Sequence, residues 1–135
     1  MVHYIQDHVG ETVERIVNMY EPGDQMSVKN TLSSVLKTVI SQKLLNAKTG
    51  GLILVPEIMN VNSTIAAQIR QEKFSVSEIE DSIHSLKLSG CKSFESSFAD
   101  LYVKGRIDMQ TIINNCNPDT LDLIKNLIVN SGGMI

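Results

Sequence analysis

The chain has 135 residues, of which 42% are hydrophobic and 20% are charged, and its formal net charge is −3. This length allows one modest core rather than two full domains, and the composition is that of a folded protein rather than a disordered one. Without a basic excess, nucleic acid is not expected as a partner, and no apolar run approaches the roughly 20 residues that cross a bilayer, so no membrane insertion is expected.

The first part of the chain is predicted to form two helices. Apolar residues recur at helical spacing from Val9 to Tyr20, and the Pro22-Gly23 pair then favours a turn. Asp24 is a suitable N-cap for the second helix. The stripe expected to be buried on this helix comprises Val28, Leu32, Val35, Leu36, Val39 and Ile40. We therefore expect the second helix to continue to about residue 40.

A β-hairpin is predicted near residues 40–58. The turn-forming residues 46–51 are followed by the β-favouring stretch 52–58, which is rich in Leu, Ile and Val. Pro56 is expected near a sheet edge, because its nitrogen cannot donate a hydrogen bond to a neighbouring strand.

The remainder of the chain is predicted to be helical, with short helices that begin at recognisable caps. Asn62 or Ser63 caps a helix through Arg70, and a capping box over 75–78 begins another through about Leu88.

Three more helices are predicted to begin after Ser93, Asp108 and Asn117, the last with Pro118 at its first position. The apolar residues expected inside are Phe94, Phe98, Leu101, Tyr102, Ile112, Ile113, Leu121, Ile124, Leu127 and Ile128.

The residues that nucleotide hydrolysis requires are missing from this sequence. A P-loop has the form G-x-x-x-x-G-K-[ST], in which backbone N–H groups and a lysine hold the phosphates. Lys48-Thr49 is instead followed by Gly50-Gly51, an order typical of a turn. We therefore expect no catalytic residue and no bound cofactor in this chain.

Metal binding is not expected either. His3, His8 and His84 have no Cys or carboxylate spaced to complete a site. Cys91 and Cys116 have neither zinc-site nor disulfide spacing and are interpreted as reduced thiols.

Several segments of the chain together resemble one known family. They are 12–20 (TVERIVNMY), 39–45 (VISQKLL), 51–59 ending in PEIM, 65–73 and 90–107. In order and spacing they resemble the region after the histidine box of the PilT-like type IV pilus retraction ATPases, a branch of the secretion ATPases. The resemblance covers about residues 9 to 115.

The resemblance implies an α+β fold, mostly helical with one β-hairpin. This fold would be the C-terminal portion of a RecA-like P-loop ATPase domain that lacks the P-loop half. The chain would form a single unit with a helix–hairpin part over 1–60 and a helical C-terminal subdomain over 61–135. ATP and Mg²⁺ would bind only in the intact parent, which would be the ATPase, and this chain alone would not hydrolyse ATP.

The resemblance also implies a role in pilus retraction and twitching motility or in secretion, through hexamer assembly and the conformational change of the motor. Partners would be same-family subunits in a homo-oligomer, and the pilus or secretion machinery. The location would be cytoplasmic, at the inner membrane face. Polar positions that match the family, and are therefore candidates for interface or core support, are Arg15, Gln42, Glu57 and Arg70.

Some positions depart from the family pattern. Ile5 takes the place of the box histidine, with His3 and His8 out of register. In the helix that the family uses for retraction, Ala66 replaces an arginine and Gln68 an apolar residue. These changes argue against full motor activity.

Two other functions stay open from the sequence. The chain could be a free-standing helical interaction domain derived from such an ATPase, or a small enzyme with an unrecognised site, which no residue cluster supports. A fragment without its core sheet would expose an apolar face, so a dimer or higher oligomer is expected. The residues expected near that contact are Val28, Leu32, Val35 and Val39.

Overall fold

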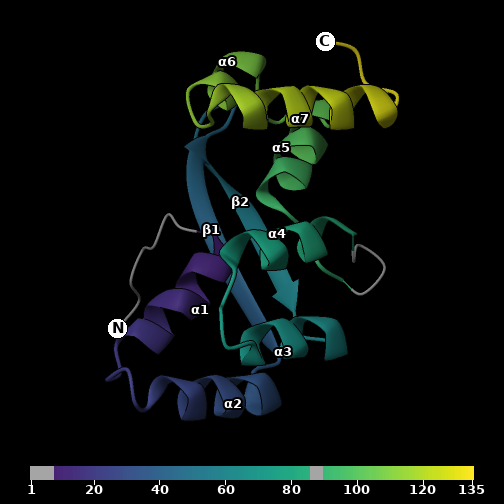
Figure 1. Ribbon diagram of the computed structural model, residues 1–135. Helices are drawn as coiled ribbons and strands as arrows, with labels where there is room; N and C mark the ends of the chain where they lie inside the picture. The colour runs from purple at the N-terminus through teal and green to yellow at the C-terminus, as the bar shows by residue number, and fades with distance from the viewer. Residues whose placement is uncertain (1–7, 86–89) are drawn as a thin grey trace. The chain divides into compact units, whose positions relative to one another are not determined.

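The computed structural model describes residues 8–85 and 90–135 as helices and one two-stranded sheet (Figure 1). The helices are α1 (Val9–Asn18), α2 (Gln25–Val35), α3 (Ser63–Arg70), α4 (Val76–Ser85), α5 (Phe94–Val103), α6 (Met109–Ile113) and α7 (Pro118–Asn130). The strands β1 (Thr38–Asn46) and β2 (Leu52–Asn60) form a hairpin. The prediction of a mostly helical fold with one hairpin is confirmed.

The contacts divide the described residues into two compact units. The first unit takes its residues from Met1–Ser41 and Glu57–Lys92, and the second from Gln42–Pro56 and Ser93–Ile135. Each unit thus combines one part of the hairpin with helices. The predicted single unit, with parts over 1–60 and 61–135, stays a prediction beside this grouping, in which β1 and β2 each contribute to both units.

The core of the first unit lies between α1, α3, α4 and the adjoining part of β2. Its buried residues are Val9, Val13, Met59, Ile65, Ile69, Ile79, Ile83 and Cys91. A Cβ on Gly10 would lie only 3.2 Å from Val76 Cγ1. The absence of a side chain at Gly10 therefore allows α1 to pack closely against α4.

The core of the second unit is built around the aromatic residues of α5. Its buried residues are Leu45, Ile53, Val55, Phe94, Phe98, Ala99, Ile107, Ile112, Ile124 and Ile128. The Nζ of the partly buried Lys43 lies 4.6 Å from the centre of the Phe94 ring of this core. This distance is within the range of a cation–π interaction.

Side-chain caps fix the starts of four helices, as the sequence predicts. Asn62, Ser93, Asp108 and Asn117 each accept a hydrogen bond from the backbone N–H three residues later. Each cap satisfies a donor that has no partner inside the helix. The Ser75 hydroxyl likewise accepts the N–H of Glu78 at the start of α4.

The second helix does not continue to Ile40, so that prediction is wrong. α2 ends at Val35, and Leu36 has an extended ψ of 125°. Beyond it, alternate residues point inward, with Ser41 and Leu45 buried and Ile40 exposed. A period of two is that of a strand, and the apolar residues that extended the helical stripe belong to β1.

The buried face of α2 also differs from the prediction. Its buried residues are Lys29 and Ser33, whereas Val35 is 61% exposed. In the second unit, Ile113 is 43% exposed although it was expected inside, because in the short α6 Ile112 is the residue that enters the core. The predicted end of the α4 helix near Leu88 lies outside the described residues.

Candidate functional site

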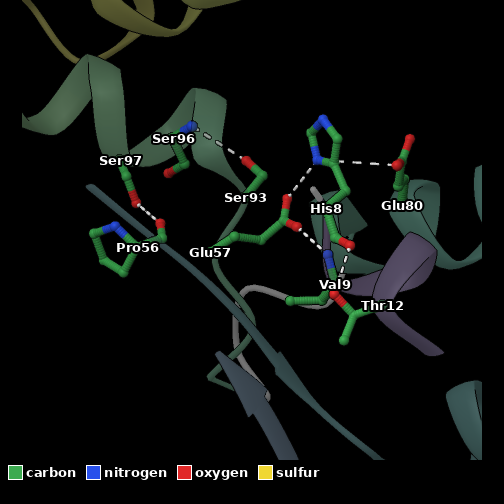
Figure 2. A network of polar contacts seen from close by, with 9 residues as sticks. All are labelled: His8, Val9, Thr12, Pro56, Glu57, Glu80, Ser93, Ser96 and Ser97. Atoms are coloured by element: carbon green, nitrogen blue, oxygen red, sulfur yellow. Dashed lines mark hydrogen bonds and ion pairs between the residues drawn. The ribbon is translucent and has the colours of Figure 1, made fainter. Parts of the chain in front are cut away.

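Glu57 on β2 is a buried carboxylate, 2% exposed, and both of its oxygens accept hydrogen bonds (Figure 2). Oε1 accepts the backbone N–H of Val9 at 2.7 Å, and Oε2 lies 3.0 Å from Nδ1 of His8. Val9 is the first residue of α1, where the N–H groups lack intrahelical partners and the helix dipole is positive. The carboxylate therefore lies where the helix stabilises a negative charge.

His8 extends this network to a third element of the first unit. Its Nδ1 lies 3.9 Å from Oε1 of Glu80 on α4, and its carbonyl accepts the hydroxyl of Thr12 (Figure 2). The network thus links the start of α1 to β2 and α4. Such an arrangement holds elements together and positions α1. Within residues 8–85 and 90–135, no three His, Cys, Asp or Glu side chains gather closely enough to hold a metal ion.

Glu57 is one of the four polar positions selected from the sequence, and Arg15 is another. Arg15 lies on the exposed side of α1. With Glu11, Glu14, Asn18 and Val76 it lines a shallow surface hollow of the first unit. A surface arginine among carboxylates can contact another molecule, and the interface role of Arg15 stays a prediction.

Gln42 lies in the middle of β1 with its side chain exposed. The register of the hairpin follows from hydrogen bonds at its two ends, where the N–H of Val61 donates to Lys37 and the N–H of Ala47 donates to Gly51. In this register Gln42 is directly opposite Pro56. The environment of Gln42 is that of an open surface and not of a core.

Arg70 is the last residue of α3, and its Nη1 donates to the Ser33 hydroxyl of α2 at 3.4 Å. Nearby, the buried Lys29 donates from Nζ to the carbonyls of Gln71 at 2.7 Å and Glu72 at 2.9 Å. A cation at these carbonyls complements the negative end of the α3 dipole. Sequence reasoning missed Lys29, since no local pattern shows which helix end this side chain will contact.

The structure does not gather the four selected residues into one site. Glu57 is buried at the start of α1, Arg70 lies at the end of α3, and Arg15 and Gln42 lie on exposed surfaces. Glu57 fits core support by its burial and hydrogen bonds. The interface roles of Arg15, Gln42 and Arg70 stay predictions.

In the second unit, the Cys116 thiol interacts with the charges of Lys43 and Glu95, a group of residues that the sequence pattern did not indicate. Burial raises the pKa of the Cys116 thiol, and the neighbouring Glu95 raises it further, while the Lys43 ammonium partly lowers it. A thiol kept protonated is a poor nucleophile and a poor metal ligand. Cys116 is partly buried against the core of the second unit, so it contributes to the packing there.

In the described part of the chain, no helix is both long and apolar enough to cross a bilayer.

No family model matches the chain. Among curated proteins, it is 32% identical over 98 residues to a "Twitching motility protein" of Neisseria gonorrhoeae, a match that covers 72% of this chain and 26% of that protein. It is 28% identical over 100 residues to the "Type IV pilus retractation ATPase PilT" of Pseudomonas aeruginosa, covering 74% of this chain and 28% of that protein. The chain thus spans little more than a quarter of either relative's length.

The chain is also similar in fold to solved structures of pilus and secretion ATPases. The crystal structure of the pilus retraction motor PilT with bound ADP superposes with a TM-score of 0.70 and 26% identity, over 87% of this chain and 32% of that one. The DotB ATPases of Yersinia pseudotuberculosis and Legionella pneumophila have TM-scores of 0.63 and 0.64. They are 14% identical and cover 90% and 82% of this chain, but 28% and 30% of their own lengths. At that identity the likeness shows the fold alone.

Proposed function

Since this chain corresponds in sequence and in fold to the C-terminal region of the PilT-like type IV pilus retraction ATPases, we propose that it acts as that region of a pilus or secretion motor. In this role it serves hexamer assembly and the conformational change of the motor. The observation that carries the proposal is the agreement between 32% sequence identity to a twitching motility protein and a TM-score of 0.70 to the retraction motor.

The proposal assigns ATP hydrolysis to the rest of an intact motor. It is supported by the sequence, which lacks the glycine-rich loop with Lys and Ser or Thr that holds nucleotide phosphates. ATP and Mg²⁺ are accordingly ligands of the parent, and this chain alone binds neither. Calorimetric titration with Mg-ATP is expected to give no saturable heat. A saturable micromolar site would contradict this part of the proposal.

The Glu57 network supports a mechanical role for α1. In the family that this chain resembles, the segment corresponding to α1 directly follows the histidine box, which lies on the nucleotide side of the motor. Its first N–H and the His8 ring both bind the buried carboxylate of β2. Buried charge-assisted hydrogen bonds are strong, so a displacement of the chain before α1 would be transmitted to β2 rather than absorbed by a loose contact.

The proposed partners are subunits of the same family, and through them the pilus or secretion machinery at the cytoplasmic face of the inner membrane. Arg15 and Arg70 supply exposed charge for contacts between subunits. The guanidinium group suits such contacts because it can bind a carboxylate through two donors.

Co-assembly with a full-length relative tests this function. The chain is mixed with the Pseudomonas aeruginosa PilT ATPase during refolding of the hexamer, and the hexamers are weighed by native mass spectrometry. Mixed hexamers with reduced ATPase activity are expected. Arg15→Glu should lower incorporation, whereas Lys125→Glu on α7 should leave it unchanged. If the chain never enters a hexamer at any mixing ratio, the proposed assembly role is wrong.

A further inference from the structure

His8 is the residue before α1, and its ring lies between two acidic side chains of the first unit (Figure 2). Its Nδ1 is 3.0 Å from Oε2 of Glu57 on β2 and 3.9 Å from Oε1 of Glu80 on α4. The side chains of His8 and Glu80 are each 31% exposed, whereas that of Glu57 is 2% exposed. One titratable ring, partly shielded from water, therefore contacts two other elements of the same unit.

The contact with Glu57 requires a proton on the ring. Oε1 of Glu57 accepts the backbone N–H of Val9 at 2.7 Å, and Oε2 is the oxygen that meets Nδ1 of His8. A carboxylate only accepts hydrogen bonds, so Nδ1 must donate. One tautomer of the neutral ring can do so, but a hydrogen bond between two ionised groups is roughly twice as strong as a neutral one. The strength of this contact therefore depends on whether the ring is charged.

Most other charged groups on the elements around the ring are also acidic. Those within one turn of the contacts are Glu11 on α1, Glu78, Asp81 and His84 on α4, and Lys92, whose backbone pairs with Ile58 next to Glu57. Arg15 follows two turns later on α1. The two carboxylates at 3.0 and 3.9 Å are close enough to favour the protonated ring, against the opposing effect of its partial burial.

We propose that this contact is a proton-dependent clasp, in which the protonated ring of His8 holds the start of α1 to β2 and α4, and loss of the proton loosens that hold. A histidine ordinarily titrates at about pH 6.5, and a neighbouring opposite charge moves this midpoint upward by about one unit or more. The clasp therefore responds to pH close to neutrality. It is a property of the first unit and is independent of the motor role proposed above.

The titration of the His8 ring tests the clasp directly. The ring C–H signals of the full chain are followed by NMR from about pH 5 to about pH 9, and a midpoint about one unit above the ordinary 6.5 is expected. Glu80→Gln removes one of the two carboxylates and should lower the midpoint by about 0.5 unit. Asp81→Asn is the matched control, since it removes the same charge from the next residue of α4, which is exposed, and should lower the midpoint less.

Melting temperatures of the unchanged chain and of His8→Gln test the hold on α1 over the same pH range. A histidine that binds its proton more tightly in the folded chain adds stability that is fully present below the unfolded value of about 6.5. That stability is lost as pH rises through the higher folded value. The unchanged chain should therefore melt about 3–6 °C above His8→Gln at acidic pH, and the gap should shrink toward alkaline pH.

Amide exchange locates the effect. After correction for the intrinsic dependence on pH, exchange in the first turn of α1 should become faster through the His8 titration, whereas exchange in α7 of the second unit should not. A midpoint at or below the ordinary value would overturn the proposal. So would equal shifts in Glu80→Gln and Asp81→Asn, or a gap in melting temperature that stays constant with pH. If His8→Gln fails to fold, the ring titrations of the unchanged chain and of Glu80→Gln still decide.

Discussion

The carboxylate of Glu57 accepts the first backbone N–H of α1, from Val9, at 2.7 Å across 48 residues of sequence. The same carboxylate bonds the ring of His8, so the start of the helix is held from two directions by one buried side chain. Burying a carboxylate costs free energy unless its oxygens accept hydrogen bonds. The burial of Glu57 and the position of the start of α1 therefore depend on each other.

Glu57→Gln is expected to lower the free energy of unfolding by about 1.5–3 kcal/mol, the cost of losing a hydrogen bond to a charged group in a buried site. Urea denaturation measures this change. Glu80→Gln is the matched control, since Glu80 is half-exposed and 3.9 Å from the same ring, and its effect should stay below about 1 kcal/mol. Equal effects at the two positions would show that Glu57 has no special role at the start of α1.

Lys29→Met should weaken the attachment of α2 to the end of α3. The methionine keeps most of the apolar stem but loses the ammonium that binds the Gln71 and Glu72 carbonyls. A loss of about 1–3 kcal/mol is expected, with faster amide exchange at the end of α3. Lys37→Met, at an exposed position, should change stability by less than about 0.5 kcal/mol. Unchanged exchange in the first variant would contradict the assignment.

The raised pKa of Cys116 predicts slow alkylation. Only the thiolate reacts, so iodoacetamide should modify Cys116 more slowly at neutral pH than a free cysteine, in a Cys91→Ala background that leaves one thiol. Lys43→Met removes the charge that lowers this pKa and should move the rate profile to higher pH. Glu95→Gln should move the profile to lower pH. Shifts of the opposite sign would refute this account of the cluster.

The lowered pKa of Asp108 predicts that the stability of the chain depends on pH under acidic conditions. The N–H of Thr111 binds its carboxylate and holds the pKa of Asp108 below its ordinary value of 3.8. The unfolded chain therefore binds a proton more readily, so the stabilisation is present above that ordinary value and is lost as pH falls through the lowered pKa. Melting temperatures from pH 5 downward should fall less steeply in Asp108→Asn than in the unchanged chain. If the melting temperatures of the two proteins fell equally steeply with pH, Asp108 would not contribute to the pH dependence.

Local signals predicted the helix starts well. Asn62, Ser93, Asp108 and Asn117 cap their helices as expected, because a cap is decided by residues within one turn of each other. The resemblance of ordered segments similarly predicted the fold class, since the hairpin turn and the helices around it lie in the same order in the structure.

Contacts between distant residues could not be predicted in the same way. The apolar stripe predicted for the second helix continued through Ile40, because a helical period and a strand period coincide over a few residues. Only packing decides that Leu36 turns to an extended conformation. Sequence reasoning did not single out Lys29, and it predicted no partner for Glu57, because the partners of both are more than 40 residues away in the chain.

The sharing of β2 between the two cores affects how the chain folds during synthesis. Val55 belongs to the core of the second unit and Met59 to that of the first, on the same strand. The residues of the first unit are all present once Lys92 has been made, but at that stage α5 and α7 do not yet exist to cover Ile53 and Val55. A ribosome-bound intermediate should therefore pair its hairpin early while Ile53 and Val55 stay exposed. Exposed apolar residues of this kind bind chaperones and promote aggregation with neighbouring nascent chains.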